Sequence, residues 1–124
     1  MLRALALLVL ALASLSAPAA AELRLLMVEQ PGCAYCARWD AEIAPIYPKT
    51  PEGEAAPLER VQLRGPYPEG IDLGPRPVFT PTFILVQDDR EAGRIEGYPG
   101  EDFFWGLLNQ MMTETGEYEG EGTR

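Results

Sequence analysis

The sequence predicts an α/β fold in which a four-stranded mixed sheet is flanked by helices. An apolar strand pattern at residues 23–28 and a second short strand at residues 58–63 are separated by a helical pattern, as in parallel strands joined by a crossover helix. An apolar strand pattern at residues 82–86 and a further short strand at residues 92–96 are joined by a charged turn and predict an antiparallel hairpin. A second helical pattern with a wide apolar face follows this hairpin.

Residues 1–21 are expected to be a secretory signal peptide and not part of the fold. Arg3 gives a positive start, an apolar stretch follows, and the alanines at 19–21 supply the small residues of a cleavage site. A membrane anchor is the alternative, but the apolar stretch is shorter than the roughly 20 residues that span a bilayer. We therefore expect cleavage before Glu22 and export to the periplasm.

The rest of the chain is strongly acidic. Of the 10 basic and 19 acidic residues, only Arg3 lies in the first 21, which leaves a net charge of −10. This charge disfavours binding to nucleic acid or anionic lipid and suits a protein that meets its partners transiently. No apolar segment after residue 21 is long enough to span a membrane, so we expect no stable membrane insertion, and we also expect a monomer. The length allows one domain, residues 22–112, and the Gly- and Glu-rich residues 113–124 are expected to form a disordered tail. The chain has no histidine, which excludes histidine-based catalysis.

The first strand leads through a turn into the first helix. Leu, Met and Val dominate residues 23–28, and Pro31 and Gly32 end the turn that follows. From residue 33 to about residue 47 large apolar residues recur at helical spacing, and Pro45 should kink or end the helix near Ala44.

Prolines and glycines dominate the two connections in the middle of the chain. Residues 48–57 hold three prolines and are expected to be an exposed loop. The strand at 58–63 follows, with Val61 and Leu63 facing inward. Residues 65–81 hold five prolines and are expected to lack regular structure.

The last helix should begin after Pro99 and Gly100, where acidic residues occupy the first turn. Its apolar residues form two adjacent stripes, which together are expected to dock on the sheet. The two stripes consist of Phe103, Leu107 and Met111 and of Phe104, Leu108 and Met112.

Cys33 and Cys36 are the only cysteines of the chain and lie at the expected start of the first helix. Free backbone N–H groups and the positive end of the helix dipole favour a thiolate there. Because only a thiolate attacks disulfides, the pattern predicts a redox pair in which Cys33 attacks and Cys36, one turn deeper, resolves.

Two other interpretations of this pair remain. A structural disulfide would close a very short loop and stabilise the fold little. A Cu(I) or zinc site would suit two thiolates, but no histidine or further cysteine completes a tetrahedral set. For copper, the additional ligand would have to be Met27 or a group from a partner. We therefore expect no bound metal.

Three motifs, spread over nearly the whole of residues 22–124, resemble the thioredoxin superfamily in its short form, without an extra N-terminal strand and helix. They are Pro31-Gly32-Cys33-Ala34-Tyr35-Cys36 after a strand, Thr80-Pro81-Thr82 before the next-to-last strand, and Gly97 after the last strand. More narrowly, residues 33–43 and 45–50 are similar to periplasmic thioredoxin-like proteins of the bacterial sulfur-oxidation (Sox) system.

The resemblance implies a thiol–disulfide oxidoreductase that reduces disulfides or thiol adducts on an exported partner, such as the Sox sulfur-carrier protein. A membrane electron donor of the CcdA/DsbD type would recharge it, and the Cys33–Cys36 disulfide would be its only redox group, without a cofactor. The alternatives are a thiol oxidase or isomerase on the same fold, and a non-catalytic copper-binding or partner-binding module.

The resemblance also implies roles for residues around the cysteines. Thr80 and a cis Pro81 would bind an extended substrate, together with Tyr35 and Gly97. Ala34 and Tyr35 would tune the redox potential. Since neither of these two residues is basic, they favour a reductant over an oxidant.

This chain departs from the usual thioredoxin pattern near the cysteines. Gly32 stands where a tryptophan is usual, and Ala34 and Tyr35 replace the usual Gly-Pro pair. Met27 occupies the place of a buried aspartate that often accepts a proton. Glu29 is then the nearby candidate for that role.

Overall fold

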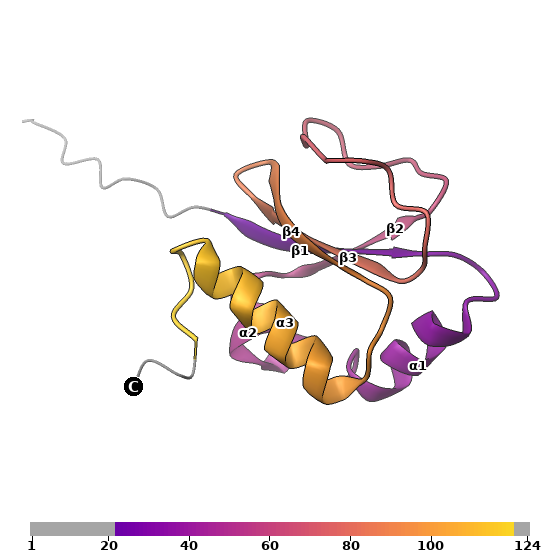
Figure 1. Cartoon of the computed structure of the whole chain (residues 1–124), viewed down its shortest axis with the longest axis horizontal. Coiled ribbons are helices and arrows are strands. Elements are labelled where there is room, and N and C mark those ends of the chain that lie inside the picture. Colours follow the sequence, from indigo (N-terminus) through magenta and orange to yellow (C-terminus); the bar gives the residue numbers. More distant parts are fainter. Residues whose placement is uncertain (1–21, 121–124) are drawn as a thin grey trace, which may run out of the picture.

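The computed structural model describes residues 22–120. The expected signal peptide lies outside this part of the chain, as do residues 121–124. The elements, in chain order, are β1 (Leu23–Glu29), α1 (Ala34–Glu42), the 3-10 turn η1 (Tyr47–Lys49), α2 (Pro51–Ala55), β2 (Leu58–Gln62), β3 (Thr82–Gln87), β4 (Arg90–Glu96) and α3 (Glu101–Glu114) (Figure 1).

The four strands form one mixed sheet in the order β2-β1-β3-β4. β1 runs parallel to β2 and antiparallel to β3, and β3 and β4 form the antiparallel hairpin. The predicted four-stranded mixed sheet is confirmed. Its central strand β1 is buried on both faces, which explains why its sequence is almost continuously apolar.

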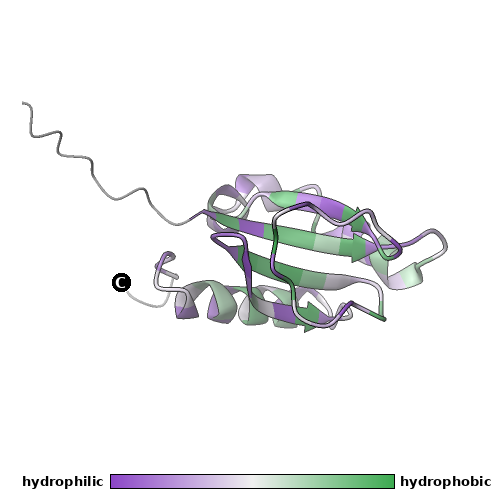
Figure 2. Ribbon diagram, turned by 90° about the horizontal axis from the view of Figure 1, so that it is seen from above, coloured by the Kyte–Doolittle hydropathy of each residue, from purple (hydrophilic) through white to green (hydrophobic). Residues whose placement is uncertain are grey.

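Each face of the sheet carries its own hydrophobic cluster. On the helical face, the rings of Trp39, Phe83 and Phe104 pack with centroid distances of 4.9–5.8 Å. The opposite face is covered by residues 65–81, which lie across the sheet from the helices (Figure 1). Figure 2 shows the sheet from above, with hydrophobic colouring along its strands.

Residues 65–81 contain no helix and no strand, as predicted, apart from an isolated bridge between Asp72 and Arg90. Tyr67, Ile71 and Leu73 from this segment pack on the second cluster. The irregular segment is therefore a structural cover of the sheet.

The predicted exposed loop at residues 48–57 is wrong. Thr50 caps α2 by accepting a hydrogen bond from the N–H of Gly53 at 3.0 Å, and Pro51 takes the first helical position. Glu52 and Gly53 are buried. The prolines and glycine suggested a loop, but proline at a helix start is favourable and the glycine allows close packing. α1 ends at Glu42 with Ile43 as its C-cap, close to the predicted end near Ala44.

The expectation that both apolar stripes of α3 dock on the sheet is half wrong. Phe104, Leu108 and Met112 are fully buried, whereas Phe103 is 70% exposed and Leu107 is 41% exposed. A straight helix on a sheet buries one stripe, and the adjacent stripe faces outward unless another element covers it. Within residues 22–120 no helix is long and apolar enough to cross a membrane.

The expected tail begins at Thr113, but the first two of its residues complete α3. Tyr118 is partly buried and packs against the cluster on the helical face. Residues 121–124, the end of the expected tail, lie outside the described residues.

Candidate redox site

Cys33 and Cys36 lie where β1 passes through a turn into α1. Cys33 is the N-cap of α1, in an extended conformation, and its Sγ accepts a hydrogen bond from the N–H of Cys36 at 3.1 Å. The two cysteines form a disulfide with an S–S distance of 2.20 Å. In the reduced protein, the same backbone N–H and the helix dipole would stabilise a thiolate on Cys33.

The two sulfurs differ in accessibility. Cys33 is partly exposed, whereas Cys36 is only 5% exposed and belongs to the cluster on the helical face. An accessible nucleophile next to a buried second thiol is the arrangement that thiol–disulfide exchange through a mixed disulfide requires.

The strand register brings the other predicted site residues to the same end of the sheet. Val28 of β1 pairs with Thr82 of β3, and Thr82 also pairs with Glu96 of β4. The cysteine motif after β1, the Thr80–Pro81 segment before β3 and Gly97 after β4 therefore share one edge. The Thr80–Pro81 peptide bond is cis in the structure.

Gly97 and Gln30 connect these segments. The N–H of Gly97 donates to the carbonyl of Pro81 at 2.7 Å, and the side-chain amide of Gln30 donates to Oγ1 of Thr80 at 2.9 Å. Gly97 has a φ of +87°, and a Cβ there would meet no atom within 4 Å, so backbone conformation and not close packing accounts for the glycine. No sequence pattern predicted the hydrogen bond between Gln30 and Thr80.

Exposed apolar side chains surround this edge. Tyr35 is 59% exposed, and Val78 and Phe79, just before Thr80, are 71% and 61% exposed. Val78 and Phe79 were not among the predicted site residues. Two large apolar residues next to each other in an irregular, proline-rich segment could have indicated an exposed contact surface. Ala34 is exposed beside Tyr35. Trp39, in contrast, is fully buried in the core.

Met27 and Glu29 lie next to Arg60 of β2. Met27 is fully buried, and its Sδ lies 3.7 Å from the Arg60 guanidinium. Arg60 also pairs with Glu29 at 2.6 Å and with Asp40 of α1 at 2.7 Å. The hydrogen bond to Asp40 is the main reason that the pKa of Arg60 is raised. A cation against the Met27 thioether disfavours a copper ligand there.

Tyr98 ties α1 to the connection between β4 and α3. Its hydroxyl donates to Glu42, whose other carboxylate oxygen accepts from Arg38 at 3.0 Å. The bonds from Tyr98 and then Arg38 lower the pKa of Glu42, and burial followed by the Glu42 bond raises the pKa of Tyr98. Tyr47 is similar, since burial raises its pKa and its hydroxyl donates to the carbonyl of Ala56 at 2.6 Å.

We expect the free energy of unfolding to fall above pH 10, the ordinary pKa of tyrosine. Tyr47 and Tyr98 keep their protons in the folded state to higher pH than in the unfolded state, so the folded state binds more protons and loses stability as the pH rises. By pH 11 each tyrosine should cost about 1 kcal/mol. Urea unfolding between pH 8 and pH 11 measures this.

Tyr98→Phe should reduce this alkaline loss, because the variant has no proton to give up at that position. A Tyr98→Phe protein with the full alkaline loss would contradict the assignment.

Within residues 22–120 no group of three or more His, Cys, Asp or Glu side chains is placed to hold a metal ion.

No protein-family model and no curated protein matches the chain. Among solved structures, the chain is similar to the periplasmic thioredoxin SoxS from Paracoccus pantotrophus, in its reduced form. The two are 62% identical with a TM-score of 0.74, and the match covers 76% of this chain and 99% of that one. This similarity agrees with the expected periplasmic location.

Proposed function

The chain belongs to the thioredoxin superfamily as a SoxS-type periplasmic thioredoxin, and on that basis we propose that it reduces an exported partner protein. The substrate would be a disulfide or a thiol adduct on that partner, and the Sox sulfur-carrier protein is the partner that the family suggests. The observation that carries the proposal is the pairing of a partly exposed Cys33 with a buried Cys36 at a helix start.

In the proposed reaction the Cys33 thiolate attacks one sulfur of the partner. A bond forms between that sulfur and Cys33 as the partner's own disulfide or adduct bond breaks, and the leaving sulfur takes a proton from water. Cys36, as a thiolate, then attacks Cys33 and frees the partner as a thiol. Two electrons pass to the partner, and the protein ends with the Cys33–Cys36 disulfide.

The edge around the cysteines suits an extended partner segment. The backbone of Thr80 would pair with that segment beside Pro81 and Gly97, and Tyr35 would contact its apolar side chains. Val78 and Phe79 extend the same apolar surface. Because the periplasm is oxidising, the dithiol has to be regenerated, and a membrane electron donor of the CcdA/DsbD type would do this.

The direction of electron flow is tested by equilibrating the protein with glutathione buffers. A potential near −120 mV is typical of a strong thiol oxidant. We expect this protein to have a much more negative reduction potential. Neither Ala34 nor Tyr35 adds positive charge that would stabilise the reduced form further. About 30 mV corresponds to a tenfold change in the equilibrium constant, so alkylation and mass spectrometry of the two forms resolve the difference.

Ala34 is exposed between the cysteines and provides the comparison. Ala34→His adds a group that stabilises the thiolate and should raise the potential. A parent protein already near −120 mV, with no change in Ala34→His, would favour the thiol oxidase or isomerase alternative.

A further inference from the structure

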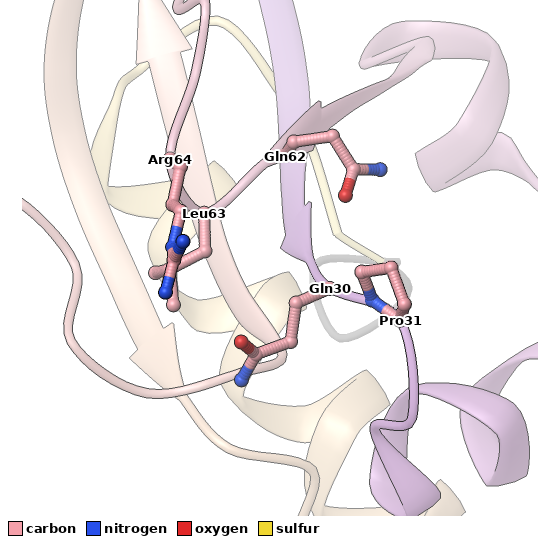
Figure 3. Close-up of a pocket in the computed structure, with 5 residues that line it drawn as sticks. All are labelled: Gln30, Pro31, Gln62, Leu63 and Arg64. Atoms are coloured by element: carbon pink, nitrogen blue, oxygen red, sulfur yellow. The ribbon is translucent and has the colours of Figure 1, made fainter.

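A pocket of about 230 Å³ lies beside the turn that leads to Cys33. Gln30 and Pro31 form one wall after β1, and residues 62–64 form the other wall at the end of β2 (Figure 3). β1 and β2 are parallel neighbours. The pocket therefore lies at the carboxyl ends of two parallel strands, the place where α/β sheets commonly bind ligands.

The backbone around this pocket is held on several sides. The N–H of Leu63 donates to the carbonyl of Glu29 at 2.8 Å, and the carbonyl of Leu63 accepts from the Tyr67 hydroxyl at 2.9 Å. The N–H of Gly65 donates to the carbonyl of Gln62 at 2.8 Å. Arg64 is thus fixed through its backbone neighbours, and binding would mainly cost the ordering of its side chain.

Arg64 has no carboxylate partner among the residues that the structure describes. Four other arginines, in contrast, pair with carboxylates of the same chain, and these are Arg24, Arg38, Arg60 and Arg94. Glu29, the acidic residue that precedes the pocket, is already paired with Arg60. In a chain with so many acidic residues, Arg64 is left available to an anionic group from outside.

Gln30 links the pocket to the segment where the partner backbone is expected. One of its side-chain N–H groups donates to Oγ1 of Thr80, and among residues 22–120 its second N–H and its carbonyl oxygen have no hydrogen-bond partner. Figure 3 shows the polar ends of Arg64 and Gln30 on the same side of the pocket, while Gln62 points to the other side. Leu63 and Pro31 supply the apolar part of the pocket lining.

We infer that this pocket binds a carboxylate of the partner, located close in sequence to the partner's reactive sulfur. The inference rests on the proposed function and adds the substrate class of the site. A guanidinium accepts a carboxylate through two parallel hydrogen bonds, and a neighbouring amide N–H adds a third donor. The carboxylate can come from an Asp or Glu side chain or from the C-terminus of the partner.

The test uses reduced protein and three short peptides, each with one cysteine joined by a disulfide to 2-thiopyridine. The first peptide has no carboxylate, the second ends in a free carboxylate one residue after the cysteine, and the third has a glutamate there and an amidated end. Cys33 attacks the peptide sulfur, thiopyridine leaves and is followed by its absorbance, and Cys36 then releases the peptide thiol.

Arg64→Gln should lower the second-order rate constant about fivefold to tenfold for a carboxylate peptide and leave the neutral peptide unaffected. If Arg64→Gln reacts more slowly than the parent protein with the second peptide alone, the pocket binds the carboxylate of a chain terminus. If it reacts more slowly with the third peptide alone, the pocket binds the carboxylate of a side chain. Arg64→Lys should still react faster with a carboxylate peptide than with the neutral peptide, by a smaller factor than the parent protein. Added salt should reduce this difference in rate.

Arg90→Gln is the matched control. Arg90 is exposed, pairs in register with Gln87 at the far end of the sheet, and has no carboxylate partner among the described residues. If Arg90→Gln and Arg64→Gln lower the rate constant for the carboxylate peptides equally, the cause is the general charge of the protein. If Arg64→Gln lowers the rate constant equally for all three peptides, the cause is a change in the structure of the site. Either result overturns the inference. If the parent protein reacts with none of the peptides, the proposed function itself fails.

Discussion

Replacing Cys36 with serine is expected to leave the protein covalently attached to its partner through Cys33. Serine cannot attack the mixed disulfide, so the intermediate should live more than about a hundred times longer than in the parent protein. The N–H at position 36 still bonds the Cys33 sulfur in this variant, because that contact comes from the backbone. Non-reducing gels of alkylated periplasmic extract, followed by mass spectrometry, identify the attached protein.

Cys33→Ser is the control for this experiment. It should form no adduct and lose the reduction of disulfides by more than about a thousandfold, since it lacks the attacking thiolate. If Cys33→Ser keeps its function in cells and Cys36→Ser traps nothing, the non-catalytic copper-binding or partner-binding module is the better description. Recovery of general secreted proteins in place of a sulfur carrier would exclude the Sox partner and leave the chemistry intact.

Gly53→Ala is expected to destabilise the fold by about 3 kcal/mol, although alanine is normally the better helix residue. A Cβ at this position would lie 1.8 Å from the carbonyl oxygen of Tyr47. That oxygen accepts hydrogen bonds from both the N–H and the hydroxyl of Thr50, at 3.1 and 2.7 Å. Moving the carbonyl group of Tyr47 to make room for the Cβ would break these two bonds. Thermal unfolding should show a midpoint lower by more than about 10 °C.

Gly106→Ala in α3 is the matched comparison. A Cβ there would meet no atom within 4 Å, so this variant should gain about 0.5–1 kcal/mol from helix propensity alone. A Gly53→Ala protein that is as stable as Gly106→Ala would show that α2 moves away from Tyr47 at little cost.

The four strands, the parallel pair β1 and β2, the β3–β4 hairpin and the cysteine pair were predictable, because each follows from patterns in short stretches of sequence. An apolar strand, a turn and a helix start place Cys33 at an N-cap without any long-range information. α2 was missed because proline and glycine were counted as loop signals, whereas Thr50 followed by Pro51 is also a helix start. The exposure of Phe103 could not be predicted, since a stripe pattern does not show whether one or two stripes are covered.

The contacts that shape the site depend on pairings between distant segments. Gln30 and Thr80 are 50 positions apart, and their bond exists only because β1 and β3 are neighbours. Arg64 reaches the turn before Cys33 only because β2 lies parallel to β1. Single-sequence patterns reveal which residues have useful chemistry, but not which of them meet.

The long segment between β2 and β3 has a consequence for attempts to redesign specificity. Its first half, with Tyr67 and Ile71, seals the hydrophobic cluster on one face of the sheet, and its second half carries Val78 and Phe79 to the redox edge. The proposed recognition surface and the cover of the sheet therefore lie on one continuous stretch of chain. Exchanging only the recognition half between homologues would risk uncovering the sheet, so the whole segment is the natural unit for a graft.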